Sequence, residues 1–226
     1  VITGALELVA LRGAGDTGIE ELAEQALDAV RRGSTMTQRM LAFSRQQALR
    51  PQPTVINELL NGAEVLLRRS LQASIEFSVE GSDANPIAFV DPAQLETALL
   101  NLCINARDAM ETGGRLSVRV RTARLNDQSL PSGVDLSPGA YVIIEVQDDG
   151  PGMTQDILQQ AFDPFFTTQR EGRGTGLGLS MVYGFAMQSN GAVAVDSEPG
   201  KGSTFRLYLP QMTGLQVIRG GPVTSQ

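Results

Sequence analysis

The first fifty residues carry a hydrophobic pattern that is typical of helices. Residues 1–12 read as the end of one helix, which the stretch 13–16 (Gly-Ala-Gly-Asp) interrupts. Thr17 and Glu20 then form a capping box, because each side chain can satisfy a free backbone amide of the next helix. Along that helix apolar residues recur mostly every three or four positions: Ile19, Leu22, Ala26, Val30, Met36, Met40 and Phe43.

Two helices with such stripes cannot bury them alone. Residues 1–50 are therefore predicted to form a helical hairpin that dimerises into a four-helix bundle. The alternative is a hairpin that packs on the rest of its own chain.

Pro51 and Pro53 mark the end of this helical region, because proline ends a helix and restricts the residue before it. Beyond them the pattern becomes mixed. It predicts a helix over about 56–70, followed by strands near 73–80 and 86–90.

Four later segments complete the pattern. Residues 115–121 alternate between apolar and polar, which predicts a strand with one wet face. Residues 141–146 are more uniformly apolar and are predicted to be a central buried strand. Further strands are predicted near 192–197 and 203–209, and the last of these should point one way with Phe205, Leu207 and Leu209.

Strands grouped with helices on one side predict an α+β sandwich over residues 51–210. Residues 211–226 include Gly220, Gly221 and Pro222 and are predicted to be a flexible tail or a linker.

Composition narrows the possible functions. The net charge of −7 and the pI near 4.7 give no support to nucleic acid or anionic lipid as the main partner. No stretch is long and apolar enough to span a membrane, so a soluble segment is expected. A single cysteine, Cys103, excludes an internal disulfide, and the absence of histidine excludes His-based acid–base catalysis and His-ligated metal.

The helix predicted over Asp91–Met110 carries the first candidate site. Asp91 should be its N-cap, with proline in the first turn. Its buried stripe is predicted to be Leu95, Ala98, Leu99, Leu102, Ala106 and Ala109. Asn101, Asn105 and Asp108 lie within about 60° of one another beside that stripe, and a carboxamide oxygen suits Mg²⁺. The alternative is that the asparagines are ordinary surface residues.

Two glycine-containing motifs are the other candidates. In the segment 148–152 (Asp-Asp-Gly-Pro-Gly), a carboxylate can accept a hydrogen bond from an exocyclic amine, although the same residues also make a plain turn. The glycine-rich segment 172–179 enters a predicted helix over 180–189. Free backbone N–H groups at such a helix start attract an anion. The segment lacks the closing Lys of a P-loop and the preceding strand of a Rossmann fingerprint. The alternative that it is only a mobile linker therefore stays open.

Taken together, five motifs resemble the sensor histidine kinases, in the order found in that family. Asn101 to Ala109 resembles the N box, and Asp148 to Met153 the first glycine box. Phe162 to Thr168 resembles the F box, and Gly174 to Leu179 the second glycine box. Gly200 to Phe205 resembles the closing strand motif.

The resemblance implies the Bergerat fold, a mixed sheet with helices on one face, binding ATP and Mg²⁺. Asp148 is expected to bind adenine and Asn105 to bind Mg²⁺. Asn101 and Asn105 are expected to have catalytic roles. A mobile lid is expected at about 163–175, anchored by Phe165 and Phe166. The full set of expected nucleotide contacts is Asn101, Asn105, Asp108, Asp148, Gly150, Gly152, Met153, Phe166, Thr167, Thr168, Arg173, Gly174, Thr175, Gly176, Leu177, Gly178, Leu179 and Thr204.

The resemblance also implies a cytoplasmic, homodimeric protein-histidine kinase of a two-component system. Phosphoryl transfer would run from ATP to a histidine on the dimerisation helix, just before residue 1, and then to an aspartate of a receiver domain. Residues 1–8 and 41–45 resemble parts of the dimerisation helices in hybrid-type members of the family.

The chain departs from the family's pattern at several positions. Gln169 stands where a lysine is common, so Arg170 or Arg173 is expected to meet the γ-phosphate instead. Asp108 stands near the place of a basic residue, and Arg107 is expected on the far side of the helix.

Two other functions are alternatives for this sequence. ATPases of the same fold activate water with a glutamate four residues before the metal-binding asparagine. This chain has Asn101 there, and an amide cannot take a proton from water. A non-catalytic dimerisation or nucleotide-sensing module is the other alternative, against which the intact glycine motifs argue.

Overall fold

A computed structural model of the chain describes residues 19, 26, 49–128, 130–131, 134–169 and 174–212. The chain divides into two compact units, of which the larger comprises residues 48–167 and 176–226. Every element named below belongs to the larger unit. Ile19 and Ala26 are helical. The rest of the hairpin predicted over 1–50, and residues 213–226 of the predicted tail, lie outside the described residues.

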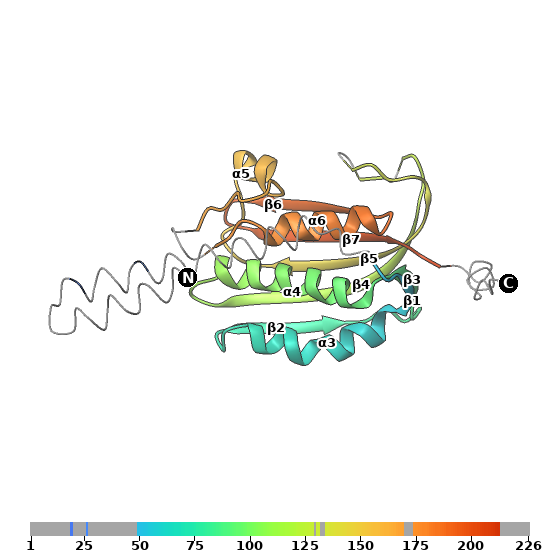
Figure 1. The fold of residues 1–226 in the computed structure, drawn as a ribbon, viewed down its shortest axis with the longest axis horizontal. Coiled ribbons are helices and arrows are strands. Elements are labelled where there is room, and N and C mark those ends of the chain that lie inside the picture. The colour runs from blue at the N-terminus through green and yellow to red at the C-terminus, as the bar shows by residue number, and fades with distance from the viewer. Residues whose placement is uncertain are drawn as a thin grey trace. The chain divides into compact units, whose positions relative to one another are not determined.

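Five strands form the central sheet of the larger unit (Figure 1). Their order across the sheet is β2 (Ile75–Glu80), β4 (Gly114–Leu125), β5 (Gly139–Asp148), β7 (Gly202–Pro210) and β6 (Ala192–Glu198). β2 runs parallel to β4, and the other neighbours are antiparallel. β5 occupies the middle and buries residues 141–144 in succession, which confirms the predicted central strand.

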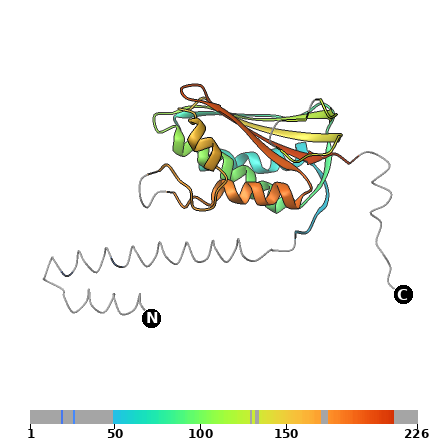
Figure 2. The same cartoon turned by 90° about the horizontal axis from the view of Figure 1, so that it is seen from above.

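Three helices cover one face of this sheet (Figure 2): α3 (Ile56–Ser70), α4 (Pro92–Ala109) and α6 (Gly178–Gln188). A short helix, α5 (Gln155–Gln160), follows β5. β1 (Gln52–Val55) and β3 (Ile87–Val90) pair as a separate two-stranded sheet beside the start of α3. The predicted α+β sandwich with helices on one face is confirmed, whereas β1 and α5 gave no signal in the sequence.

The start of α4 follows its sequence closely. The Asp91 carboxylate accepts hydrogen bonds from the backbone N–H groups of Ala93 (3.0 Å) and Gln94 (3.2 Å), so it is the predicted N-cap. Pro92 occupies the first turn, where its missing N–H costs nothing.

The buried stripe of α4 differs from the prediction at one end. Leu95, Leu99 and Leu102 are almost fully buried, as expected. Ala109 is exposed, and Met110 is buried in its place. The helix ends at Ala109, and the turn that follows directs the next side chain inward. Cys103 is also buried, because α4 has neighbours on both flanks, α3 and α6, besides the sheet.

The other face of the sheet is largely polar. The alternation in β7 puts Phe205, Leu207 and Leu209 in the main core, as predicted. Tyr208 joins a small cluster on the opposite face with Leu125, Tyr141 and Ile143. Of these residues only Leu125 lies beyond the predicted strands, because β4 extends past residue 121.

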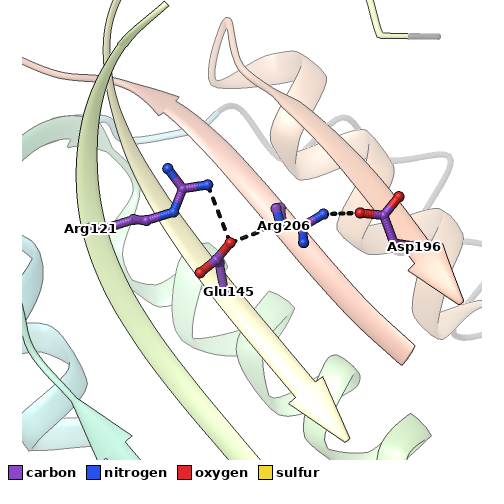
Figure 3. Close-up of polar contacts among 4 residues, drawn as sticks. All are labelled: Arg121, Glu145, Asp196 and Arg206. Carbon is purple, nitrogen blue, oxygen red and sulfur yellow. Dashed lines mark hydrogen bonds and ion pairs between the residues drawn. The ribbon is translucent and has the colours of Figure 1, made fainter. Parts of the chain in front are cut away.

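A chain of ion pairs crosses this face (Figure 3). The Glu145 carboxylate accepts hydrogen bonds from Arg206 (2.7 Å) and Arg121 (3.2 Å), and Arg206 also pairs with Asp196. Burial raises the pKa of Glu145, but the hydrogen bonds and charges of the two arginines outweigh it, so the pKa lies below its ordinary value. Opposite charges on neighbouring strands thus pair with one another across this face. No helix of the described residues has both the length and the apolar character to cross a bilayer.

Packing of α4 gives the first prediction. Leu99→Ala removes a side chain with no exposed surface and should lower the free energy of unfolding by about 2–5 kcal/mol. Leu66→Ala in α3 is the matched control, because Leu66 is 50% exposed. It should change stability by less than about 0.5 kcal/mol. Urea unfolding followed by circular dichroism measures both, and equal effects would contradict the assigned core.

Candidate functional site

The first candidate residue, Asn101, lies where α4 meets the start of α6. A Cβ placed on Gly178, the first residue of α6, would lie 3.9 Å from the side chain of Asn101. The Nδ2 atom of Asn101 is buried and has no hydrogen-bond partner. A buried amide that lacks a partner costs free energy, so this donor is suited to a ligand that brings an acceptor.

The start of α6 adds further donors. Leu177 is its N-cap residue and provides no side-chain cap. The first backbone N–H groups of a helix have no partner within it, and they carry the positive end of the helix dipole. The Leu177 side chain is 1% exposed and Leu179 packs against the core, so their side chains are structural. Leu177 and Leu179 can therefore make their predicted nucleotide contacts only through backbone groups.

Asn105 and Asp108 lie on the next turns of α4 and are half-buried. The Asn105 side chain makes no hydrogen bond to the residues that the structure describes, which leaves its oxygen free to be a ligand. Asp108 pairs with Arg107 at 2.6 Å, and Arg107 also donates to the carbonyl of Ser70. The Arg107 guanidinium therefore contacts the adjacent Asp108 and the carbonyl of Ser70. It does not simply project from the far side of the helix, as the sequence predicted.

The two aspartates at the end of β5 face opposite ways. Asp148 is buried, and its Oδ1 accepts a hydrogen bond from the backbone N–H of Gly150 at 3.0 Å. Asp149 faces solvent and pairs with Arg115, which donates to it from its backbone N–H (2.6 Å) and its side chain (3.1 Å). Of the two, only Asp148 faces the helical layer.

Burial changes the proton affinity of Asp148. Desolvation raises the pKa of its carboxyl above the ordinary value, and the nearby Asp149 charge adds to that, while backbone N–H donors of Gly150 and Ser203 oppose it. The charged form is thus disfavoured in the folded chain. A donor supplied by a ligand would relieve this cost.

The loop after Asp148 is pressed against the β6–β7 turn. Gly152 has φ +67°, and a Cβ there would lie 2.0 Å from the carbonyl oxygen of Glu198. Gly202 has φ +82°, and a Cβ there would lie 2.0 Å from the carbonyl oxygen of Asp148. Only glycine fits such close backbone contacts, so these positions hold the loop in place. Met153 packs against the core beside them.

The predicted lid begins at a fixed point. The backbone N–H of Phe165 donates to the carbonyl of Gly176 at 2.8 Å, and both residues have positive φ, +69° and +64°. The Phe165 ring is 40% exposed, so this residue is anchored by its backbone. The ring that anchors the segment is Phe162, which packs edge-on against Phe205 and beside Tyr183. Phe166 is half-buried.

The remaining lid residues are only partly described. Thr167 and Thr168 are exposed, and Gly174 and Thr175 are half-buried. Arg173 and the alternative phosphate contact Arg170 lie outside the described residues.

Thr204 does not lie beside Asp148. In the sheet register, Thr204 pairs with Gln147, and Ser203 pairs with Asp148. Side chains alternate along a strand, so Ser203 shares the Asp148 face and Thr204 faces the opposite side. Ser203 thus shares the face of Asp148 with Phe205, Leu207 and Leu209, and the nucleotide contact expected of Thr204 stays a prediction.

The described residues thus combine one buried carboxylate acceptor, one unpaired amide donor, a free carboxamide oxygen and a helix start. The C-terminal part of α4 connects them: Asn101 contacts the start of α6, and a Cβ on Gly150 would lie 3.1 Å from Met110. No cluster of three His, Cys, Asp or Glu side chains within the described ranges could hold a metal. This set suits a ligand with an amine at one end and anionic groups at the other.

Comparisons with known proteins agree with this chemistry. Residues 90–213 match the family described as histidine kinase-, DNA gyrase B- and HSP90-like ATPases. The chain is 40% identical over 196 residues to the sensor kinase CckA of Brucella abortus, covering 86% of this chain and 21% of that protein. It is 31% identical over 210 residues to the sensor histidine kinase ZraS of Escherichia coli, covering 92% and 42%. The chain thus spans less than half the length of these relatives.

Solved structures show the same fold. The mycobacterial sensor histidine kinase MprB superposes with a TM-score of 0.55 at 25% identity, over 71% of this chain and 97% of that one. ShkA, solved in complex with AMPPNP, superposes with a TM-score of 0.65 at 24% identity, over 94% and 43%. Because the family match covers more than half of the 226 residues, this chain belongs to the histidine kinase-, DNA gyrase B- and HSP90-like ATPase family, among the sensor histidine kinases.

Proposed function

We propose that this chain is the ATP-binding catalytic core of a two-component sensor histidine kinase. The observation that carries the proposal is the unpaired, buried Nδ2 of Asn101 beside the start of α6. An amide in that position can donate to a phosphate oxygen but cannot take a proton from water. Phosphoryl transfer depends mainly on positioning and charge stabilisation, so it needs no such base. This favours a kinase over an ATPase of the same fold.

Adenine is assigned to Asp148. A buried carboxylate with remaining acceptor capacity suits an exocyclic amine. The amine of the base would add a donor to the one that Gly150 already provides. Gly150 and Gly152 allow close approach of the base, and the start of α6 faces the phosphates with residues Gly176 and Gly178.

Mg²⁺ is assigned to Asn105. Its carboxamide oxygen is a hard, neutral ligand, and Mg²⁺ completes its shell with water and phosphate oxygens, so a single protein ligand is enough. The ion would neutralise charge on the transferred phosphoryl group. Asn101, one turn earlier, would orient a phosphate oxygen through its N–H.

The remaining partners follow from the relatives. The curated relatives are named sensor kinases, and one solved neighbour of this fold, ThkA, is described in complex with the response regulator protein TrrA. The chain holds no histidine, so the phosphoryl acceptor is not one of its 226 residues. We assign the acceptor to a dimerisation helix and the next acceptor to a receiver-domain aspartate. Residues 1–50 would form the dimer.

The adenine assignment predicts a specific loss in Asp148→Asn. The amide presents a donor where the amine needs an acceptor, so ATP affinity measured by calorimetry should fall by about 1.5–3 kcal/mol. Asp149→Asn is the matched control and should keep ATP affinity within about twofold, because Asp149 faces solvent. An equal effect in both variants would refute the assignment.

The same carboxyl predicts a pH dependence. The folded-state pKa of Asp148 is raised, so its ionisation costs stability above both pKa values, and this cost disappears as pH falls. Asp148→Asn should therefore leave the folded chain at least as stable at neutral pH. ATP binding by the wild type should weaken as pH falls through the raised pKa. The phosphates of ATP also titrate, and their contribution is the same for the wild type and the Asn variant. The Asn variant should therefore lack only the pH dependence that comes from the Asp148 carboxyl.

The kinase assignment is tested by phosphorylation with labelled ATP of a version extended upstream through a dimerisation-helix histidine. Acid-labile phosphohistidine should form in the wild type, and Asn105→Ala should abolish it while weakening metal-free ATP binding less. Asn61→Ala on the exposed surface of α3 is the control and should behave as wild type. Steady ATP hydrolysis without phosphohistidine would favour an ATPase. Equal loss of binding with and without Mg²⁺ would contradict the metal role of Asn105.

The dimer assignment rests on the apolar stripe of residues 1–50. Replacing Leu22 and Val30 together by glutamate should give a monomer, because a buried unpaired charge is costly. Glu24→Gln, a polar position outside the stripe, should leave the dimer intact. Light scattering measures the mass, and a monomeric wild type would refute the assignment.

A further inference from the structure

One hydroxyl connects the elements behind Asp148. Ser197, near the end of β6, accepts a hydrogen bond from the backbone N–H of Met153 at 2.8 Å. The same Oγ donates to the backbone carbonyl of Gly202 at 2.9 Å and lies 3.0 Å from the Oγ of Ser203. A single side chain thus joins the loop after β5 to the first residues of β7.

The protons of this cluster can be assigned by counting. A serine hydroxyl has one hydrogen to donate and two lone pairs that accept. Because Ser197 gives its hydrogen to Gly202, the hydrogen between the two hydroxyls comes from Ser203. Ser197 then uses one lone pair for Met153 and the other for Ser203. Every hydrogen-bonding position of Ser197 is filled, and the directions of these bonds are fixed.

The cluster lies directly behind the buried carboxylate. Asp148, Ser203 and Ser197 are register partners across the neighbouring strands β5, β7 and β6, so the three side chains share one face of the sheet. The backbone of Ser203 also lowers the pKa of the Asp148 carboxyl, against the effect of burial. Gly202, whose carbonyl accepts from Ser197, touches the backbone of Asp148 so closely that a Cβ would lie 2.0 Å from its carbonyl oxygen.

We propose that Ser197 is a positioning residue that holds the Asp148 carboxylate in the orientation that recognises the exocyclic amine of adenine, an inference that rests on the proposed function. It acts through two contacts on either side of Asp148. Through Met153 it fixes the loop 149–153, whose Gly150 N–H donates to Asp148. Through Gly202 and Ser203 it fixes the strand start whose backbone meets Asp148.

A merely structural role makes a different prediction. If Ser197 only stabilised the turn between β6 and β7, its loss would weaken binding of every nucleotide equally or lower stability alone. If it positions Asp148, its loss should weaken only the ligand whose base uses the carboxylate. Purine riboside triphosphate has the same ring system and phosphates as ATP but lacks the exocyclic amine, so it distinguishes the two roles.

The experiment measures binding of ATP and of purine riboside triphosphate to the whole chain by calorimetry. Ser197→Ala should weaken ATP about fivefold to tenfold, the effect of a lost buried hydrogen bond, and purine riboside triphosphate less than about twofold. Ser197→Thr keeps the hydroxyl in a strand position that accepts β-branching, and should stay within about twofold of wild type for both ligands. Ser78→Ala, an exposed serine on the opposite edge strand β2, is the matched control and should change neither affinity.

Each outcome decides the matter. Equal weakening of both nucleotides, or unchanged ATP affinity, in Ser197→Ala overturns the positioning role. If Ser197→Ala does not fold, Ser197→Cys, which keeps the volume but weakens the hydrogen bonds, is judged by the same ratio. If the wild type itself shows no preference for ATP over purine riboside triphosphate, adenine recognition by Asp148 fails, and the inference fails with it. An ATP preference that the wild type shows and that Ser197→Ala, or Ser197→Cys in its place, keeps unchanged refutes the inference alone.

Discussion

Leu95, Leu99 and Leu102 are almost completely removed from water where α4 packs between α3, α6 and the sheet. Burying each such side chain contributes about 1.5–3 kcal/mol, so the rotation of α4 about its axis is strongly fixed. Asn101 and Asn105 take their places from that rotation. The apolar contacts of the helix therefore set the geometry of the polar ones, and the same helix reaches the start of α6 at one point and the loop after β5 at another.

The sheet solves a related problem at β5. A strand buried in succession over residues 141–144 must be apolar, yet this strand ends in a buried carboxylate. Backbone donors of Gly150 and Ser203 partly offset the desolvation of the Asp148 carboxylate. Glycines allow the close backbone contacts that hold the surrounding loop in place. On the opposite face the same strand carries Glu145, whose two arginine partners keep it charged. The strand β5 thus holds one carboxylate that burial desolvates, Asp148, and one that two arginines pair, Glu145.

Much of this arrangement was predictable from sequence, because periodicity reports which face is buried. The pattern predicted α3, α4, α6 and the strands of the sheet, and the family resemblance, not the pattern, gave Asp148 as the expected adenine contact. It missed β1 and α5, which are too short to show a period, and it misplaced Ala109, since where a helix ends depends on its surroundings. The motif alone does not separate Thr204 from Ser203, whereas the alternation of side chains along β7 places Ser203 on the face of Asp148. Ser197 gave no signal, since its partners are backbone groups brought together only by strand pairing.

The hydrogen bond between Phe165 and Gly176 closes the chain segment 166–175 at its base. With its ends joined in this way, lengthening the segment adds loop-closure cost slowly, and each doubling of its length costs about 0.6 kcal/mol. A change in the length of the segment between these two residues therefore costs the larger unit little through loop closure. The groups that this segment offers to a ligand can therefore change with its length, while the pairing of the sheet and the packing of the helices keep their own contacts.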